Sequence, residues 1–217
     1  MTPGEPLIRW DWIASHAAEV VARIQQHVVL TLVAVTVGLA ISLALGLVVR
    51  WQGRLYEPVA WVTGTLYTIP SLALFAVLIP FTGLSVLTAE IGLVSYTLLI
   101  LTRGVVGGLR SVPPDVRETA RAMGFTSGQL LWRVELPLAV PVILGAVRVA
   151  AITTIGLVTV TALIGQGGLG YFILEGILRF FSTPLIVGAV GSVALGALAD
   201  ALLVQAQRRL TPWQRGR

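Results

Sequence analysis

Residues 28–49 read VVLTLVAVTVGLAISLALGLVV, a run of 22 residues without a single charge. A helix that crosses a lipid bilayer needs about 20 mainly apolar residues, so this stretch predicts a membrane-spanning helix. It is too long for the apolar core of a signal peptide, and the residues before it lack a basic start followed by a small-residue cleavage site. The segment therefore predicts a protein that remains in the membrane.

Four more apolar stretches follow the first. Pro70 and Pro80 interrupt the second, which we interpret as one span and then a short loop. The predicted spans run from about Tyr56 to Pro80, Leu87 to Leu109, Leu138 to Ile164 and Pro184 to Gln207. Only 12% of the chain is charged, about half the usual share of soluble proteins. The sequence thus predicts an all-α integral membrane protein with five transmembrane helices and its termini on opposite sides.

The residue types that are missing exclude several kinds of chemistry. All 15 positive side chains are arginines, and the chain contains neither lysine nor cysteine. A phosphate-loop lysine, a Schiff-base lysine, a nucleophilic thiolate and a disulfide are therefore excluded. The two histidines, His16 and His27, both precede the first long apolar run. We predict no catalytic residue, no metal site and no cofactor on this chain.

The arginines also predict the orientation, because short cytoplasmic segments collect positive charge. Eleven arginines lie at or after the ends of spans one, three and five, three lie at the opposite ends, and Arg148 lies inside a span. They do not form the continuous basic stripe that is typical of nucleic-acid binding. The N-terminus is therefore predicted outside and the C-terminus in the cytoplasm.

The chain is expected to have three parts. Residues 1–27 form an external segment in which Ile13, Ala17, Val20, Val21 and Ile24 recur at helical spacing, which predicts an amphipathic helix on the membrane surface. Residues 28–207 form the transmembrane domain, and residues 208–217 form a basic cytoplasmic tail.

The cytoplasmic connection 110–137 contains SVPPDVRETARAMGFTSGQLLWRVELP, residues 111–137. Pro113 and Pro114 suit the start of a helix, and Gly124 can end it. Thr126 lies three residues before Gln129, which is the spacing of a capping box at the start of a second helix. The sequence predicts a helix, a glycine turn and a short helix.

This connection resembles the EAA loop of the permeases of ABC importers, whose pattern is glutamate-x-alanine-x3-glycine-x9-aliphatic-x-leucine-proline. Threonine and valine replace the more usual alanine and isoleucine at positions 119 and 134. The matching residues are Glu118, Thr119, Ala120, Gly124, Val134, Leu136 and Pro137.

The resemblance implies a type I ABC-importer permease fold in a bacterial cytoplasmic (inner) membrane. It also implies that Glu118 and Ala120 lie on a coupling helix that docks on a separate ATPase, that Gly124 makes the turn allowing close approach, and that Pro137 begins the next span. ATP and Mg²⁺ would then be bound by that ATPase. Other implied partners are a second permease copy or a paralogue and an extracytoplasmic substrate-binding protein. We call residues 110–137 the coupling loop.

Three further segments resemble permeases of the osmoprotectant branch, which serve importers of glycine betaine, choline and carnitine. They are residues 68–73 (TIPSLA), 164–170 (IGQGGLG) and 210–212 (LTP). The glycine-rich segment is shared with methionine-type permeases, so a methionine-type or other small-solute importer is the alternative. A stand-alone channel or scaffold is a further alternative, but it would not need the spacing from Glu118 to Pro137. Span-interior aromatics such as Tyr67, Phe75 and Tyr96 are scattered, and no residue is assigned to the substrate.

Two other features remain. Gly165, Gly167, Gly168 and Gly170 satisfy G-x-G-x-x-G, but the run before them is far longer than a strand, so we expect a flexible or closely packed turn at the external mouth instead of a nucleotide site. Arg148 and Asp200 lie at similar depths in spans four and five, and we hypothesise that they pair, within or between subunits, at an inner gate. Alternatively, Arg148 snorkels or faces a watery vestibule.

Overall fold

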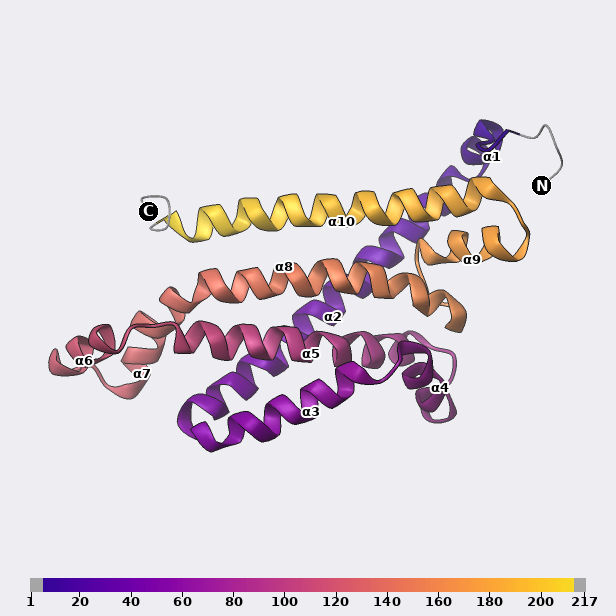
Figure 1. Cartoon of the computed structure of the whole chain (residues 1–217). Coiled ribbons are helices and arrows are strands. Elements are labelled where there is room, and N and C mark those ends of the chain that lie inside the picture. The colour runs from indigo at the N-terminus through magenta and orange to yellow at the C-terminus, as the bar shows by residue number, and fades with distance from the viewer. Residues whose placement is uncertain (1–5, 213–217) are drawn as a thin grey trace. The chain divides into compact units, whose positions relative to one another are not determined.

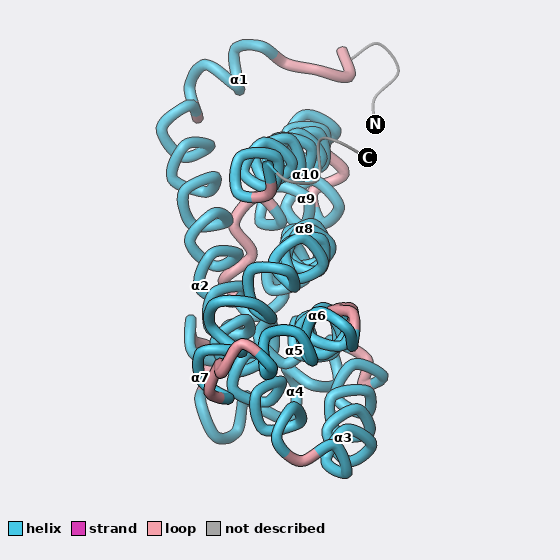
Figure 2. Tube along the Cα trace, turned by 90° about the vertical axis from the view of Figure 1, so that its left-hand side faces the viewer, coloured by secondary structure: helices cyan, strands magenta, loops and turns pink. Residues whose placement is uncertain are grey.

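The computed structural model describes residues 6–212, and every regular element in that range is helical (Figures 1 and 2). The elements are α1 (Trp10–Ser15), α2 (Ala17–Trp51), the 3-10 turn η1 (Gly53–Leu55), α3 (Tyr56–Thr68), α4 (Ser71–Thr82), α5 (Val86–Arg110), α6 (Pro114–Ala122), α7 (Ser127–Leu130), the π-helical turn η2 (Leu131–Glu135), α8 (Leu136–Val160), the 3-10 turn η3 (Thr161–Ile164), α9 (Gly170–Leu178) and α10 (Ser182–Leu210).

Four of the predicted spans are confirmed as helices that are long and apolar enough to cross a membrane: α2, α5, the run Ser127–Ile164 that contains α8, and α10. The second predicted span is wrong as a single helix, because the chain bends by 94° between α3 and α4. Pro70 disfavours a helical conformation of the residue before it and instead caps the N-terminus of α4. By length and composition the described chain thus has four spanning helices, or five if the bent pair counts as one.

The first helix differs from the prediction as well. Residues 17–27, expected to belong to a separate surface helix, are continuous with the span in the 35-residue helix α2. No proline or glycine interrupts this stretch, and an ion pair between Glu19 and Arg23, one turn apart, supports it. The predicted boundary at residue 27 therefore falls inside a helix, and only α1 stands apart.

The described residues form two compact units, and α2, α5, α8 and α10 each contribute a segment to both. Unit 1 comprises residues 6–36, 69–94 and 151–200. Its core contains Leu30 of α2, Phe75 of α4, Leu93 of α5 and Val158 of α8. Phe75 is fully buried against Gly92, where any side chain would meet the Phe75 ring. Burial of such a side chain contributes about 1.5–3 kcal/mol.

Unit 2 comprises residues 37–68, 95–150 and 201–212. Its helices approach one another closely at small residues: Gly46 of α2 faces Val105 of α5, and Gly104 of α5 faces Ala146 of α8. Such contacts are typical of helices in membranes. A buried hydrogen bond from the Thr102 hydroxyl to the Ser42 hydroxyl, 3.1 Å, also joins α5 to α2.

Much of the apolar surface is uncovered. Only 11% of the apolar window of α10 is buried, and Val190, Val193, Leu198 and Leu202 are all exposed. An apolar surface of this extent is unfavourable in water and suits a lipid environment. Residues 1–5 of the predicted external segment and 213–217 of the predicted basic tail lie outside the described residues.

Candidate functional site: the coupling loop

The first helix of the coupling loop, α6, begins and ends where its sequence predicts. Pro113 caps it and Pro114 is its first residue. At its end, the N–H of Gly124 donates to the Arg121 carbonyl and the N–H of Phe125 donates to the Ala120 carbonyl, at 2.9 and 3.1 Å. This is a Schellman motif, in which the residue after the cap adopts a left-handed conformation. Gly124 has a φ of +83°, which an L-residue adopts only with strain.

The second helix, α7, starts with the predicted capping box. The backbone N–H of Gln129 donates to the Thr126 hydroxyl at 3.3 Å, and the backbone N–H of Thr126 donates to the Gln129 side chain at 2.9 Å. The turn η2 then leads directly into α8. Leu136 and Pro137 are therefore the first two residues of α8, where both are partly buried. The coupling loop is thus an ordered helix pair, with α6 and α7 close together (Figure 1).

The residues of α6 divide between an exposed and a buried face. Glu118 and Thr119 are exposed, and Met123 just beyond the helix is 71% exposed. Ala120 is only 6% exposed and packs inward. Of the matching motif residues on α6, Glu118 and Thr119 can therefore contact another protein directly, whereas Ala120 lets the helix lie close to the rest of unit 2.

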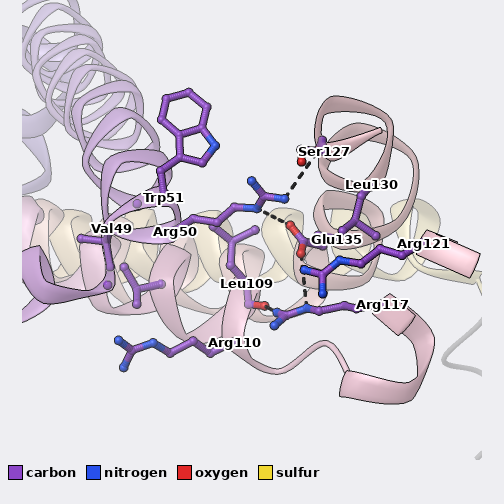
Figure 3. Close-up of a pocket in the computed structure, with 13 residues that line it drawn as sticks. Val49, Arg50, Trp51, Leu109, Arg110, Arg117, Arg121, Ser127, Leu130 and Glu135 are labelled. Carbon is purple, nitrogen blue, oxygen red and sulfur yellow. Dashed lines mark hydrogen bonds and ion pairs between the residues drawn. The ribbon is translucent and has the colours of Figure 1, made fainter. Parts of the chain in front are cut away.

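A buried carboxylate, Glu135, ties the loop to the spans. Its Oε2 accepts a hydrogen bond from Nε of Arg50 in the last turn of α2, and its Oε1 lies 3.3 Å from Nε of Arg117 on α6 (Figure 3). Glu135 itself is 4% exposed. Two guanidinium groups from different helices thus compensate one carboxylate that burial would otherwise make costly.

The same two arginines make further contacts with the backbone. Arg117 donates to the carbonyl of Leu109 near the end of α5, and Arg50 donates to the carbonyl of Ser127 at 3.4 Å. The ends of α2 and α5, the helix α6 and the turn η2 before α8 are therefore joined by one network of hydrogen bonds and ion pairs. A force applied to α6 would reach the spans through charged side chains and through the chain itself.

The sequence reasoning did not single out Glu135. It occupies the variable position between Val134 and Leu136 of the EAA pattern, where the pattern specifies no residue type. Its signal was a carboxylate two residues before Pro137, the residue expected to begin the next span. Its partner Arg50 lies 85 residues away, which the sequence does not disclose.

The glycine-rich loop belongs to unit 1 and is closely packed. Gly165, Gly167 and Gly168 all have positive φ values, of 81°, 36° and 47°. A Cβ at Gly167 would lie 2.4 Å from Ala162, and one at Gly170 would lie 2.3 Å from the Thr159 carbonyl. No side chain fits there without movement of the backbone.

The remaining residues singled out from the sequence lie within the long helices, in α3 or in α4. Arg148 lies on α8 and Asp200 on α10, and their pairing stays a prediction. The rings of Tyr67 and Tyr96 are in edge contact, with centroids 5.8 Å apart, so these two aromatics are not scattered. Phe75 is a core residue.

Glu90 is a second acidic residue that the sequence reasoning passed over. It lies near the start of α5, and both of its carboxylate oxygens are buried without a hydrogen-bond partner among the described residues. Within residues 6–212, no group of histidine and acidic side chains could hold a metal ion.

The chain matches the family described as "Binding-protein-dependent transport system inner membrane component" over residues 34–212. It is 38% identical to the osmoprotectant import permease protein OsmW of Salmonella typhimurium, over 86% of this chain and 89% of that protein. It is 35% identical to the carnitine transport permease protein OpuCB of Listeria monocytogenes, over 86% of each chain. It is 31% identical to the choline transport system permease protein OpuBB of Bacillus subtilis, over 93% of each chain.

Two solved structures are similar in fold. A chain of the inward-facing MetNI methionine ABC transporter has a TM-score of 0.80 and 25% identity, over 88% of this chain and 96% of that one. A chain of an amino acid ABC transporter with histidines has a TM-score of 0.72 and 19% identity, over 93% of this chain and 99% of that one.

Proposed function

Because the chain belongs to the family of binding-protein-dependent transport system inner membrane components, we propose that it is the permease subunit of an ATP-driven importer of quaternary-ammonium osmoprotectants. The observation that carries the solute class is the set of relatives that are 31–38% identical over most of their length, which are permeases for choline, carnitine and osmoprotectants. The chain is an inner-membrane protein, as its family is.

The coupling loop gives this function a mechanism. The exposed face of α6, with Glu118, Thr119 and the adjacent Met123, is the surface that would dock on a separate ATPase. Closure of the ATPase would move α6, and the network around Glu135 would pass that movement to the ends of α2 and α5 as a rigid-body displacement. The hydrolysing residues belong to the partner, since this chain has no lysine for a phosphate loop.

The proposed orientation follows from the arginines. Eleven of the 15 arginines in the sequence lie at or after the ends of predicted spans one, three and five, and this supports a cytoplasmic position for the coupling loop and the C-terminus. The opposite face then meets the substrate-binding protein. The transport pathway would form with a second permease copy or a paralogue.

A methionine-type importer is the second candidate, and the TM-score of 0.80 to the MetNI chain favours it. Shared fold alone does not decide the solute, because related folds host different activities. The relatives at higher sequence identity favour osmoprotectants.

The test is uptake of labelled glycine betaine and choline, with methionine as the competing solute. Proteoliposomes would hold this chain with its ATPase and substrate-binding protein. Two variants separate coupling from folding: Gly124→Asp introduces strain at a φ of +83°, whereas Gly128→Asp adds the same charge in the same loop without a positive φ. Both glycines are exposed and have open space around them.

We expect ATP-dependent uptake of betaine or choline in the unchanged protein and in Gly128→Asp, and loss of uptake in Gly124→Asp. Uptake of methionine alone would overturn the solute class while keeping the importer. Equal, ATP-independent flux in all three proteins would overturn the importer itself.

A further inference from the structure

Beside the coupling loop, unit 2 contains a pocket of about 410 Å³ whose wall is strongly basic. Arg50, Arg110, Arg117 and Arg121 line it together with a single carboxylate, Glu135. Figure 3 shows the guanidinium groups of Arg50, Arg117 and Arg121 turned toward Glu135, while Arg110 points the other way. The wall therefore has an excess of three positive charges.

The pairing of these charges is incomplete. Glu135 compensates Arg50 and Arg117, as described above. Among residues 6–212, no carboxylate contacts Arg121 or Arg110, and the Arg110 guanidinium lies over the Tyr56 ring, 4.2 Å from its centroid. Arginine presents a planar fork of N–H donors that matches a phosphate group. The pocket thus offers Arg121, which has no carboxylate partner among the described residues, to an anion of that shape.

The position of the pocket indicates where the anion comes from. It is formed where two apolar spans stop, α2 at Trp51 and α5 at Arg110, and Trp51 in its wall is 69% exposed. Tryptophan and arginine at the ends of spans are typical of the level of the lipid headgroups. Basic pockets between spans at that level bind anionic headgroups.

The pocket adjoins the face of α6 that would dock on an ATPase. Arg117 and Arg121 are one turn apart on α6, and Arg121 is exposed, as is Glu118 three residues before it. A phosphate on a lipid anchored beside α2 and α5 reaches the pocket from the membrane.

We propose that this pocket binds the phosphate of an anionic phospholipid, through Arg121, and so attaches the coupling loop to one leaflet of the membrane. The proposal requires the membrane location of the chain and does not depend on the transported solute. A soluble phosphate is the other source of the same chemistry, and the test separates the two.

The probes are phosphatidylglycerol, phosphatidylcholine and inorganic phosphate, each added to the full chain purified in a neutral detergent. Retained lipid is measured by native mass spectrometry, and stabilisation by the shift in unfolding temperature. The main variant is Arg121→Gln. Its matched control is Arg133→Gln, which removes an exposed arginine of the same loop outside the pocket. Arg121→Lys keeps the charge, and circular dichroism checks that every variant is folded.

We expect phosphatidylglycerol, but not phosphatidylcholine, to be retained by the unchanged protein and to raise its unfolding temperature. Arg121→Gln should weaken retention about fivefold, as expected for one arginine near an anionic headgroup. Arg133→Gln should leave it unchanged, and Arg121→Lys should recover part of it. Equal retention by Arg121→Gln and Arg133→Gln would overturn the proposal, as would equal shifts with the two lipids. Stabilisation by inorganic phosphate but not by phosphatidylglycerol would assign the pocket to a soluble anion and overturn the lipid source.

Discussion

Nδ1 of His27 accepts a hydrogen bond from the backbone N–H of Leu169, at 3.3 Å. On its other side, Nε2 donates to the carbonyl of Ile155, at 3.0 Å. Because one ring nitrogen accepts while the other donates, the imidazole is neutral in this arrangement. The ring is fully buried and joins α2 both to α8 and to the glycine-rich loop.

His27→Leu should lower the unfolding temperature. The leucine would fill the space but leave the buried N–H of Leu169 without its acceptor, which costs about 1–3 kcal/mol. Thermal unfolding in detergent measures the effect. His16→Leu is the control, because His16 stacks on Trp12 and is only partly buried. If the two substitutions lower the unfolding temperature equally, His27 has no specific stabilising role.

Gly168→Ala should destabilise the protein more than Gly165→Ala. Both glycines have positive φ, so each substitution costs about 1–2 kcal/mol in backbone strain. At Gly168 the new Cβ would also lie 2.6 Å from the Cβ of His27, whereas Gly165 has open space. Denaturation of the two variants, measured side by side, isolates the steric contribution. If the two substitutions lower the free energy of unfolding equally, the contact between Gly168 and His27 of α2 does not contribute to stability.

Glu135→Gln should lower the free energy of unfolding by about 3 kcal/mol, the lower end of the range for breaking a buried pair, since Arg117 is 29% exposed. The neutral side chain would leave Arg50 and Arg117 without their counter-charge. The matched control is Glu175→Gln, which breaks the pair with the 71% exposed Arg179 and should cost less than about 1 kcal/mol. If Glu135→Gln lowers the free energy of unfolding no more than Glu175→Gln does, the ion pairs of Glu135 do not hold the coupling loop to α2.

Glu90→Gln should have the opposite effect to Glu135→Gln and leave the unfolding temperature unchanged or higher. The buried carboxylate oxygens of Glu90 have no hydrogen-bond partner within residues 6–212, so an amide of similar shape removes a cost and breaks no described contact. The same thermal measurement checks it. A marked drop in unfolding temperature would mean that the carboxylate has a stabilising partner in the assembled transporter.

The orientation can be measured directly because the chain contains no cysteine. Met123→Cys places a thiol beside α6, and Leu178→Cys places one at the end of α9; the two native side chains are 71% and 69% exposed. With the predicted orientation, a membrane-impermeant maleimide should label Leu178→Cys in cells whose outer membrane is permeabilised and whose inner membrane is intact. It should label Met123→Cys only after the inner membrane is permeabilised. The reverse pattern would invert the topology.

The prolines within the apolar segments have different effects on their helices. The helix breaks at Pro70, yet Pro80 lies inside α4 and Pro141 inside α8. A proline removes one backbone donor wherever it occurs, but whether the helix continues depends on how neighbouring groups pack around the gap. The predicted loop after Pro80 therefore begins later, and the predicted second span contains a bend that its apolar composition did not reveal.

The sequence by itself determined the helical class, four of the spans, and the order of helix, glycine turn and capped helix in the coupling loop. Each of these depends on residues within a few turns of one another: apolar length, helix caps and one left-handed glycine. Only the tertiary structure joined Arg50 to Glu135, 85 residues apart, and His27 to Leu169, 142 residues apart. The partners of buried polar groups are set by which helices pack together, because a buried charge or N–H must find its partner wherever the fold brings one within reach.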